Sequence, residues 1–175
     1  MTKKTLNQNG KYVQELINII EPNFIFSKEV INRFQSAIDN TDKVNEDKAY
    51  QLNNLREKIS SIENCNLKDN SKNLVMGDGD INSPIMIIGE TPGQQEDLQS
   101  LTFQGETGNL LNKMLQAIKI KREKTYTTYS INFRPPEDRK PTSQEIKRYS
   151  IFLKDHISII NPKIIILLGS TAMEA

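Results

Sequence analysis

Residues 85–97 read IMIIGETPGQQED, and this stretch decides the fold. It begins with four apolar residues, a run of strand length, and continues through Gly89, Pro92 and Gly93. Glycine permits sharp turns and proline fixes one φ angle, so the pattern predicts a buried strand that ends in a rigid loop. In parallel α/β sheets, ligands bind at the carboxyl ends of the strands, where such loops present backbone N–H groups. The loop is therefore either a ligand site or a tight turn between a strand and a helix.

Strand and helix patterns alternate after this loop. Residues 108–118 predict a helix with one apolar face, made of Leu110, Leu111, Met114, Leu115 and Ile118. TYTTYSI (125–131) predicts a second strand, ending near Phe133, and Thr142 and Glu145 form a capping box for a helix that extends to Ile160. KIIILLG (163–169) predicts a third strand, buried on both faces because it is continuously apolar. This order predicts an α/β fold with three layers, α/β/α, around a parallel central sheet.

The region before residue 63 has a helical pattern instead. We expect a helix at 11–20 and another at 28–38, and a charged loop or frayed helix start at 39–48. A further apolar stripe consists of Leu52, Leu55, Ile59 and Ile62. The sequence therefore predicts a helical extension or linker over 1–62 and an α/β domain over 63–175.

Composition indicates an ordinary soluble protein. Of the 175 residues, 36% are hydrophobic and 26% charged, and the net charge is +1. A single cysteine excludes a disulfide within the chain, and the polar start MTKKTLNQNGKYVQ has no apolar core of a signal peptide, so we expect a cytoplasmic protein without a membrane partner. Between Lys119 and Arg148, nine Lys/Arg residues stand against four Asp/Glu residues, which marks one basic region or simply a solvated face.

Four motifs follow one another in order: GETPGQQED (89–97), TFQGETGNLLNKML (102–115), NFRPPEDRKPTSQEI (132–146) and NPKIIILLGSTA (161–172). Together they resemble the family 4 uracil-DNA glycosylases, whose motifs run GEAPGxxED, PFVGxxGxLL, CRPPxNRxPT and PKxxxxLGxxA. The segment CNLKDNSKNLVMGDGD (65–80) also looks like the one before the first strand in that family. A related domain is fused to some phage-type DNA polymerases. An unrelated small-molecule-binding domain would require this ordered match to be accidental.

The resemblance implies hydrolysis of the N-glycosidic bond of deoxyuridine in DNA, after the base has left the stack and entered a pocket. Phe103 matches the aromatic residue that stacks on the flipped uracil. The alternative is a core phenylalanine between strand and helix, but Gly105 and Gly108 beside it favour an open loop. N–H groups of the loop formed by Gly89, Pro92 and Gly93 would stabilise negative charge on the leaving base. Glu90 and Thr91 are the catalytic candidates, at the pocket rim, where they would position a water or a cation.

The resemblance also implies contact with DNA phosphates. Arg134, Pro135, Pro136 and Arg139 match a loop in which rigid prolines hold flanking arginines. The implied partner is uracil-containing DNA, single- or double-stranded. The alternative is a solvated loop before a capped helix.

The family's cofactor is a four-iron four-sulfur cluster held by four cysteines, and this chain departs from that pattern. Only Cys65 matches a ligand position; the other three positions align with Ile62, Phe133 and Tyr149. One thiolate cannot hold such a cluster, so we expect no cofactor and expect packing in its place.

Two further departures concern the chemistry. Tyr129 stands where the family has its uracil-reading asparagine, and neither Ser130 nor Asn132 is a confident substitute. The family's catalytic histidine, in a His-Pro motif after a fourth strand, has no counterpart in this sequence, and His156 lies within the predicted helix, where we expect it half-buried or at the surface.

The sequence therefore predicts a uracil-DNA glycosylase-like domain that is truncated before its last strand and helix. The third strand would then have an open edge, which a separate chain could cover. Two functions stay open: excision of uracil in base excision repair, and a non-catalytic DNA-binding or interaction module.

Overall fold

The computed structural model describes residues 33–175, and the side chains from residue 47 onward. The chain divides into two compact units, Met1–Asp39 and Asn40–Ala175, and the sheet lies in the second. Residues 40–62, which the sequence analysis assigns to an extension, are part of this second unit. The helix expected at 11–20 and the start of the one expected at 28–38 lie outside the described residues.

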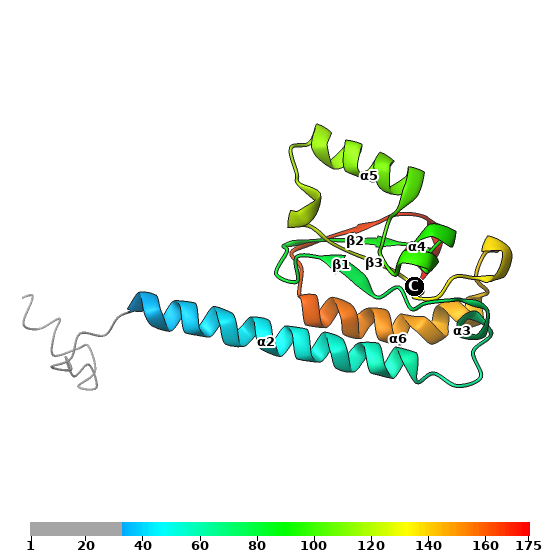
Figure 1. Ribbon diagram of the computed structural model, residues 1–175, viewed down its shortest axis with the longest axis horizontal. Coiled ribbons are helices and arrows are strands. Elements are labelled where there is room, and N and C mark those ends of the chain that lie inside the picture. Colours follow the sequence, from blue (N-terminus) through cyan, green and yellow to red (C-terminus); the bar gives the residue numbers. More distant parts are fainter. Residues whose placement is uncertain (1–32) are drawn as a thin grey trace, which may run out of the picture. The chain divides into compact units, whose positions relative to one another are not determined.

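Four strands form the central sheet: β1 (Gly77–Gly79), β2 (Ile85–Gly89), β3 (Tyr126–Tyr129) and β4 (Ile164–Leu167). Their order is β1-β3-β2-β4 (Figure 1). β2 pairs in parallel with β3 and β4, whereas β1, a strand that the sequence analysis does not predict, pairs antiparallel with β3. The α/β fold class is confirmed. The parallel register places Gly89 beside Tyr129 and Ile88 beside Leu167. The carboxyl ends of β2, β3 and β4 therefore meet at one edge of the sheet.

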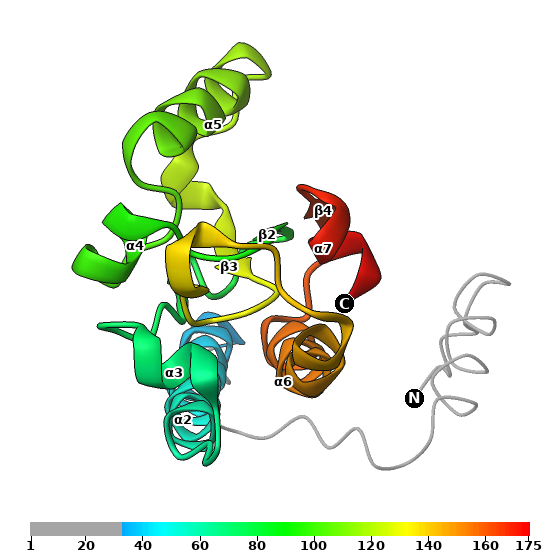
Figure 2. The same cartoon turned by 90° about the vertical axis from the view of Figure 1, so that its right-hand side faces the viewer.

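Helices cover both faces of this sheet. They are α2 (Arg33–Ser60), α3 (Asn66–Asn70), α4 (Gln94–Gln99), α5 (Gly105–Ala117), α6 (Ser143–Ile160) and α7 (Ser170–Glu174), with short 3₁₀ turns η1 (Arg122–Lys124) and η2 (Pro136–Asp138). α6 and the part of α2 after Asp39 lie side by side on one face, and α5 lies on the other (Figures 1 and 2). Leu55 and Ile59 of α2 share a core cluster with Ile146 and Tyr149 of α6. The charged segment 39–48 is helical within α2, so of the two expectations for it the loop is wrong, and the segment lies inside a helix that begins earlier, at Arg33.

The capping box of α6 is confirmed. The Thr142 backbone N–H donates to Glu145 Oε2 (2.7 Å), and the Glu145 N–H donates to Thr142 Oγ1 (3.3 Å). No helix in the described part of the chain is long and apolar enough to cross a membrane.

Two predicted burial patterns are wrong. On α5, Leu111 and Leu115 are buried, but Leu110, Met114 and Ile118 are 57–61% exposed, because only a narrow stripe of this helix contacts the sheet. β4 is an edge strand, and Ile164, Ile165 and Leu167 are 42–54% exposed rather than buried on both faces.

Candidate functional site

The loop after β2 is fastened by Glu96, a buried residue in the first turn of α4. Glu96 Oε2 accepts the Gly93 N–H (3.1 Å), and its Oε1 accepts the Gln104 N–H (2.9 Å). One carboxylate therefore links the glycine-proline loop to the segment that carries Phe103. This role of Glu96 was not predicted. The signal for it in the sequence is an acidic residue three positions after Gly93, the spacing at which a first-turn carboxylate reaches back to the start of a helix.

Phe103 lies against Tyr129 rather than in an open loop, so the expected open loop is wrong. The two ring centroids are 5.0 Å apart with planes inclined by 29°, and Phe103 is only 7% exposed. Its backbone N–H donates to Tyr129 Oη (2.9 Å). Phe103 has φ of 50°, an uncommon value for a side chain of this size, which its surroundings must maintain. Gly108 helps to maintain it, because a β-carbon there would collide with the Phe103 carbonyl.

The Tyr129 and Phe103 rings both pack on Gly89. A β-carbon placed on Gly89 would lie 2.7 Å from two Tyr129 ring carbons and 2.9 Å from the tip of the Phe103 ring. The tyrosine ring thus packs directly on the backbone at the end of β2, and Tyr129 is 5% exposed. Burial raises the pKa of Tyr129, so its hydroxyl is protonated at neutral pH.

Arg122 also contacts Phe103, a contact that no sequence pattern indicates. Its guanidinium carbon is 5.5 Å from the Phe103 ring centroid, and Nη2 donates to Thr127 Oγ1 (2.9 Å) and to the Thr102 carbonyl (3.3 Å). Burial lowers the pKa of Arg122, an effect that Asp78 opposes. A cation over the aromatic face is favourable because of the ring quadrupole, so Arg122 covers further ring area.

Glu90 caps helix α7. Its Oε1 accepts the Thr171 N–H (2.9 Å) and the Ser170 hydroxyl (3.3 Å), and Gly169, with φ of 100°, leaves room for this carboxylate. The Thr171 N–H is the main cause of the lowered pKa of Glu90. The carboxylate is therefore ionised and engaged in the fold. Thr91, the other catalytic candidate, is half-buried beside it.

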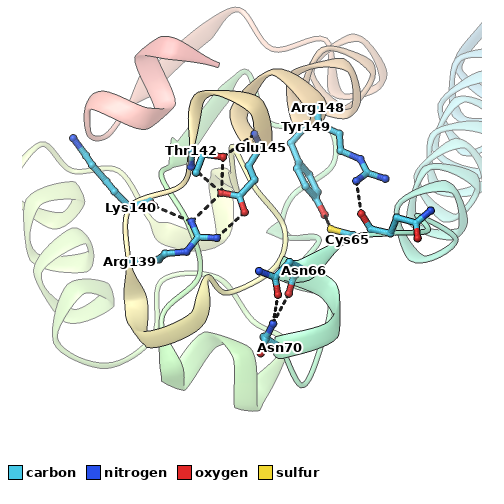
Figure 3. A network of polar contacts seen from close by, with 10 residues as sticks. Cys65, Asn66, Asn70, Arg139, Lys140, Thr142, Glu145, Arg148 and Tyr149 are labelled. Carbon is cyan, nitrogen blue, oxygen red and sulfur yellow. Dashed lines mark hydrogen bonds and ion pairs between the residues drawn. The ribbon is translucent and has the colours of Figure 1, made fainter.

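The loop after β3 carries the predicted phosphate-binding residues, and both arginines are paired. Arg134 donates twice to Asp138 (2.7 and 2.8 Å), and Arg139 donates twice to Glu145 (2.7 and 2.9 Å; Figure 3). The hydrogen bond from Arg139 lowers the pKa of Glu145 to about 2. Just after β3, the Ser130 N–H donates to the Gly89 carbonyl (2.8 Å) and the Ile131 N–H donates to the Glu90 carbonyl (3.3 Å), so this loop begins beside the glycine-proline loop.

Pro135 and Pro136 stiffen the start of the same loop. Pro135 has extended backbone angles, and Pro136 begins η2. A proline at the first position of a helical turn loses no backbone hydrogen bond, so both residues fit their conformations without strain.

The basic stretch between Lys119 and Arg148 does not form a single surface. The residues of η1 precede β3, whereas Arg134 and Arg139 follow it, so the two groups lie at opposite ends of that strand. Only the second group is at the edge where Gly89 and Phe103 lie.

The four positions that match the family's cluster ligands lie together in the core. Ile62, Cys65, Phe133 and Tyr149 are 8%, 5%, 4% and 1% exposed and belong to one apolar cluster. Cys65 Sγ is 3.2 Å from Tyr149 Oη (Figure 3). The Phe133 and Tyr149 rings meet edge to face, with centroids 6.3 Å apart. These residues do not fit a four-iron four-sulfur cluster, because only one offers a thiolate. The described residues contain no group of three or more His, Cys, Asp or Glu side chains that could hold a metal.

His156 is buried, which corrects the expectation of a half-buried or surface position. It is 2% exposed, and its Nε2 is 2.8 Å from Tyr126 Oη. Tyr126 and Tyr129 belong to different core clusters, so His156 lies on the side of the sheet away from Phe103.

Comparison with known proteins gives the same assignment for this region. The family model described as "Uracil DNA glycosylase superfamily" matches residues 76–175. The chain is 38% identical over 117 residues to a type-4 uracil-DNA glycosylase of Thermotoga maritima and 35% identical over 123 residues to one of Archaeoglobus fulgidus. These alignments cover 67% and 70% of this chain but 61% and 62% of the relatives, so the chain spans about three fifths of their length. A DNA polymerase of Bacillus phage SP01 is 30% identical over 109 residues, which are 62% of this chain and 12% of the polymerase.

The match includes every motif that forms the described edge, from the loop after β2 to the start of α7. The fold, the convergence of these motifs and the comparisons lead to one conclusion: this chain belongs to the uracil-DNA glycosylase superfamily.

Proposed function

We propose that this chain is a uracil-DNA glycosylase-like protein that binds DNA through its phosphate backbone and, as it stands, excises no base. The observation that carries the proposal is that the loop containing Arg134 and Arg139 begins beside the glycine-proline loop, at the edge where three parallel strands end. Backbone contacts from such a loop would position DNA without reading its sequence.

The ion pairs of Arg134 and Arg139 do not prevent phosphate binding. Both pairs are partly solvent-exposed, with side-chain exposures of 25% and 36% for the two arginines. Exposed ion pairs contribute only about 0–1 kcal/mol, so a phosphate can replace a carboxylate at little expense. Before a phosphate binds, the carboxylates of Asp138 and Glu145 hold the two guanidinium groups in defined orientations.

The geometry supports water activation neither by Glu90, a catalytic candidate, nor by His156, the other titratable side chain considered. Glu90 caps α7, and His156 lies in the core behind the sheet. Excision of uracil is the second candidate function. It is favoured by the meeting of Gly89 and Phe103 at one place and by the activity in the names of the relatives. It would require Tyr129 to leave its position.

We propose further that side-chain packing replaces the iron–sulfur cluster. The contacts among Cys65, Phe133 and Tyr149 join the segment after α2, the loop after β3 and α6. Arg148 strengthens the same junction by donating to the Asn64 carbonyl (2.8 Å; Figure 3). A cluster held by four cysteines at these positions would link the same segments.

We also propose that a strand from a separate polypeptide pairs with β4. β4 is at the edge of the sheet and exposes Ile164, Ile165 and Leu167. Exposed apolar edge strands are templates for pairing. Backbone amide exchange at Ile165 and Leu167 tests this: it would become slow when the second polypeptide binds, and unchanged exchange would contradict it.

Replacing both Arg139 and Lys140 with glutamine is expected to weaken binding to a single-stranded oligonucleotide about ten-fold at low salt. Each lost phosphate contact should also reduce the slope of log affinity against log salt by about 0.7. Fluorescence anisotropy titrations at several salt concentrations measure both quantities.

The matched control is the double substitution K154Q/K163Q. It removes the same charge from exposed residues, one on α6 and one at the other end of the parallel strands. Equal loss of affinity in both double variants would mean that net charge, and not this loop, binds DNA. Circular dichroism of each variant confirms that the fold is retained.

A further inference from the structure

We propose that Tyr129 occupies the place of a flipped base and keeps the base pocket closed. The proposal rests on the proposed function, in which this edge of the sheet faces DNA. In this proposal, the Tyr129 side chain is the reason why the chain does not read a base.

The geometry of the Tyr129 ring is that of a stacked ligand. Its centroid is 5.0 Å from that of Phe103, with a tilt of 29°, which is within the range of favourable aromatic pairs. The ring packs on the bare backbone of Gly89, where any side chain would collide with it. Its hydroxyl oxygen accepts the Phe103 N–H, a contact that the carbonyl oxygen of a base could equally make. A six-membered pyrimidine ring has nearly the same size and shape.

Contacts that do not involve the tyrosine also hold the walls of this pocket. Glu96 accepts the Gly93 N–H and the Gln104 N–H, so it holds the loops on both sides of the ring. Gly108 approaches the Phe103 carbonyl from α5. A smaller residue at position 129 would therefore leave a slot in place of the tyrosine ring, lined by Gly89 and Phe103. Asparagine suits the slot best, because its amide both donates and accepts hydrogen bonds, as the edge of uracil requires.

The test measures binding of free uracil to Y129N, so that it does not depend on DNA or on catalysis. Stacking of a base on an aromatic side chain is worth enough for at least about ten-fold tighter binding than in the parent chain. Perturbation of the Phe103 and Gly89 amide resonances during a uracil titration locates the site. Y129F keeps the ring and is expected to bind no better than the parent chain, and Y129N/F103A is expected to lose the gain.

Two results would overturn the proposal: uracil binding by the parent chain as tight as by Y129N, or a folded Y129N that binds no uracil. Y129S also removes the ring and serves if Y129N does not fold. Binding of the parent chain to an oligonucleotide is measured in parallel. Failure to bind DNA would overturn the proposed function, whereas the uracil titration would still decide whether Tyr129 closes the pocket.

Discussion

Replacing Tyr149 with alanine is expected to lower the free energy of unfolding by about 4 kcal/mol, the usual loss for a large aromatic side chain deleted from a core. Tyr149 is 1% exposed, and its ring meets those of Phe133 and Phe152. Its hydroxyl is 3.2 Å from Cys65 Sγ, so the substitution also leaves that group without its partner. The loss is large because the cavity would open where α2, α6 and the loop after β3 meet.

Urea denaturation followed by circular dichroism measures this effect as a lower midpoint at unchanged slope. The control is Tyr50→Ala, at a position on α2 that is 65% exposed, for which a change within about 0.5 kcal/mol is expected. A loss below about 1 kcal/mol for Y149A would contradict the view that packing at the former cluster positions holds these segments together.

Lowering the pH from 7 to 4.5 is expected to reduce the free energy of unfolding by about 2–3 kcal/mol through His156 alone. Burial lowers the pKa of His156 to about 4, below its ordinary value of 6.5. Between these two values the unfolded chain binds a proton that the folded chain does not. The stability contributed by the neutral imidazole is therefore complete above pH 6.5 and is lost as the pH falls toward 4.

His156→Gln tests this, because glutamine retains a polar partner for Tyr126 but does not titrate in this range. The difference in unfolding free energy between the parent chain and H156Q should fall by about 2–3 kcal/mol between pH 7 and pH 4.5. A constant difference would contradict the assignment. Glu145 has a lowered pKa of about 2, so its contribution is lost only below its ordinary value of 4.5 and lies outside this window.

Much of the fold was predictable because its signals are local. The apolar run that stops at Gly89 and the capping box of Thr142 and Glu145 fix the end of β2 and the start of α6 within a few residues. For the segment 39–48 the sequence left a loop and a frayed helix start open, because charged residues are tolerated in a helix when no glycine or proline interrupts it. The burial of β4 was overestimated because an unbroken apolar run indicates two covered faces only where the sheet continues beyond the strand.

The composition of the candidate site was predictable, but its arrangement was not. The motifs indicated that Gly89, Phe103 and the Arg134 loop contribute to one site for the base and the DNA. The contact between Tyr129 and Phe103 depends on the register that sets Gly89 beside Tyr129, which no local pattern gives. The role of Glu90 as a cap for α7 likewise depends on two loops that are about 80 residues apart in sequence and meet only in the folded sheet.

We expect this chain to bind the DNA backbone while Tyr129 prevents it from reading a base. The ratio of its affinities for two single-stranded oligonucleotides that differ only by one uracil in place of thymine tests both parts. Equal affinities are expected, both falling with salt, and no abasic sites after prolonged incubation. Binding about ten-fold tighter to the uracil strand, or release of free uracil, would contradict it.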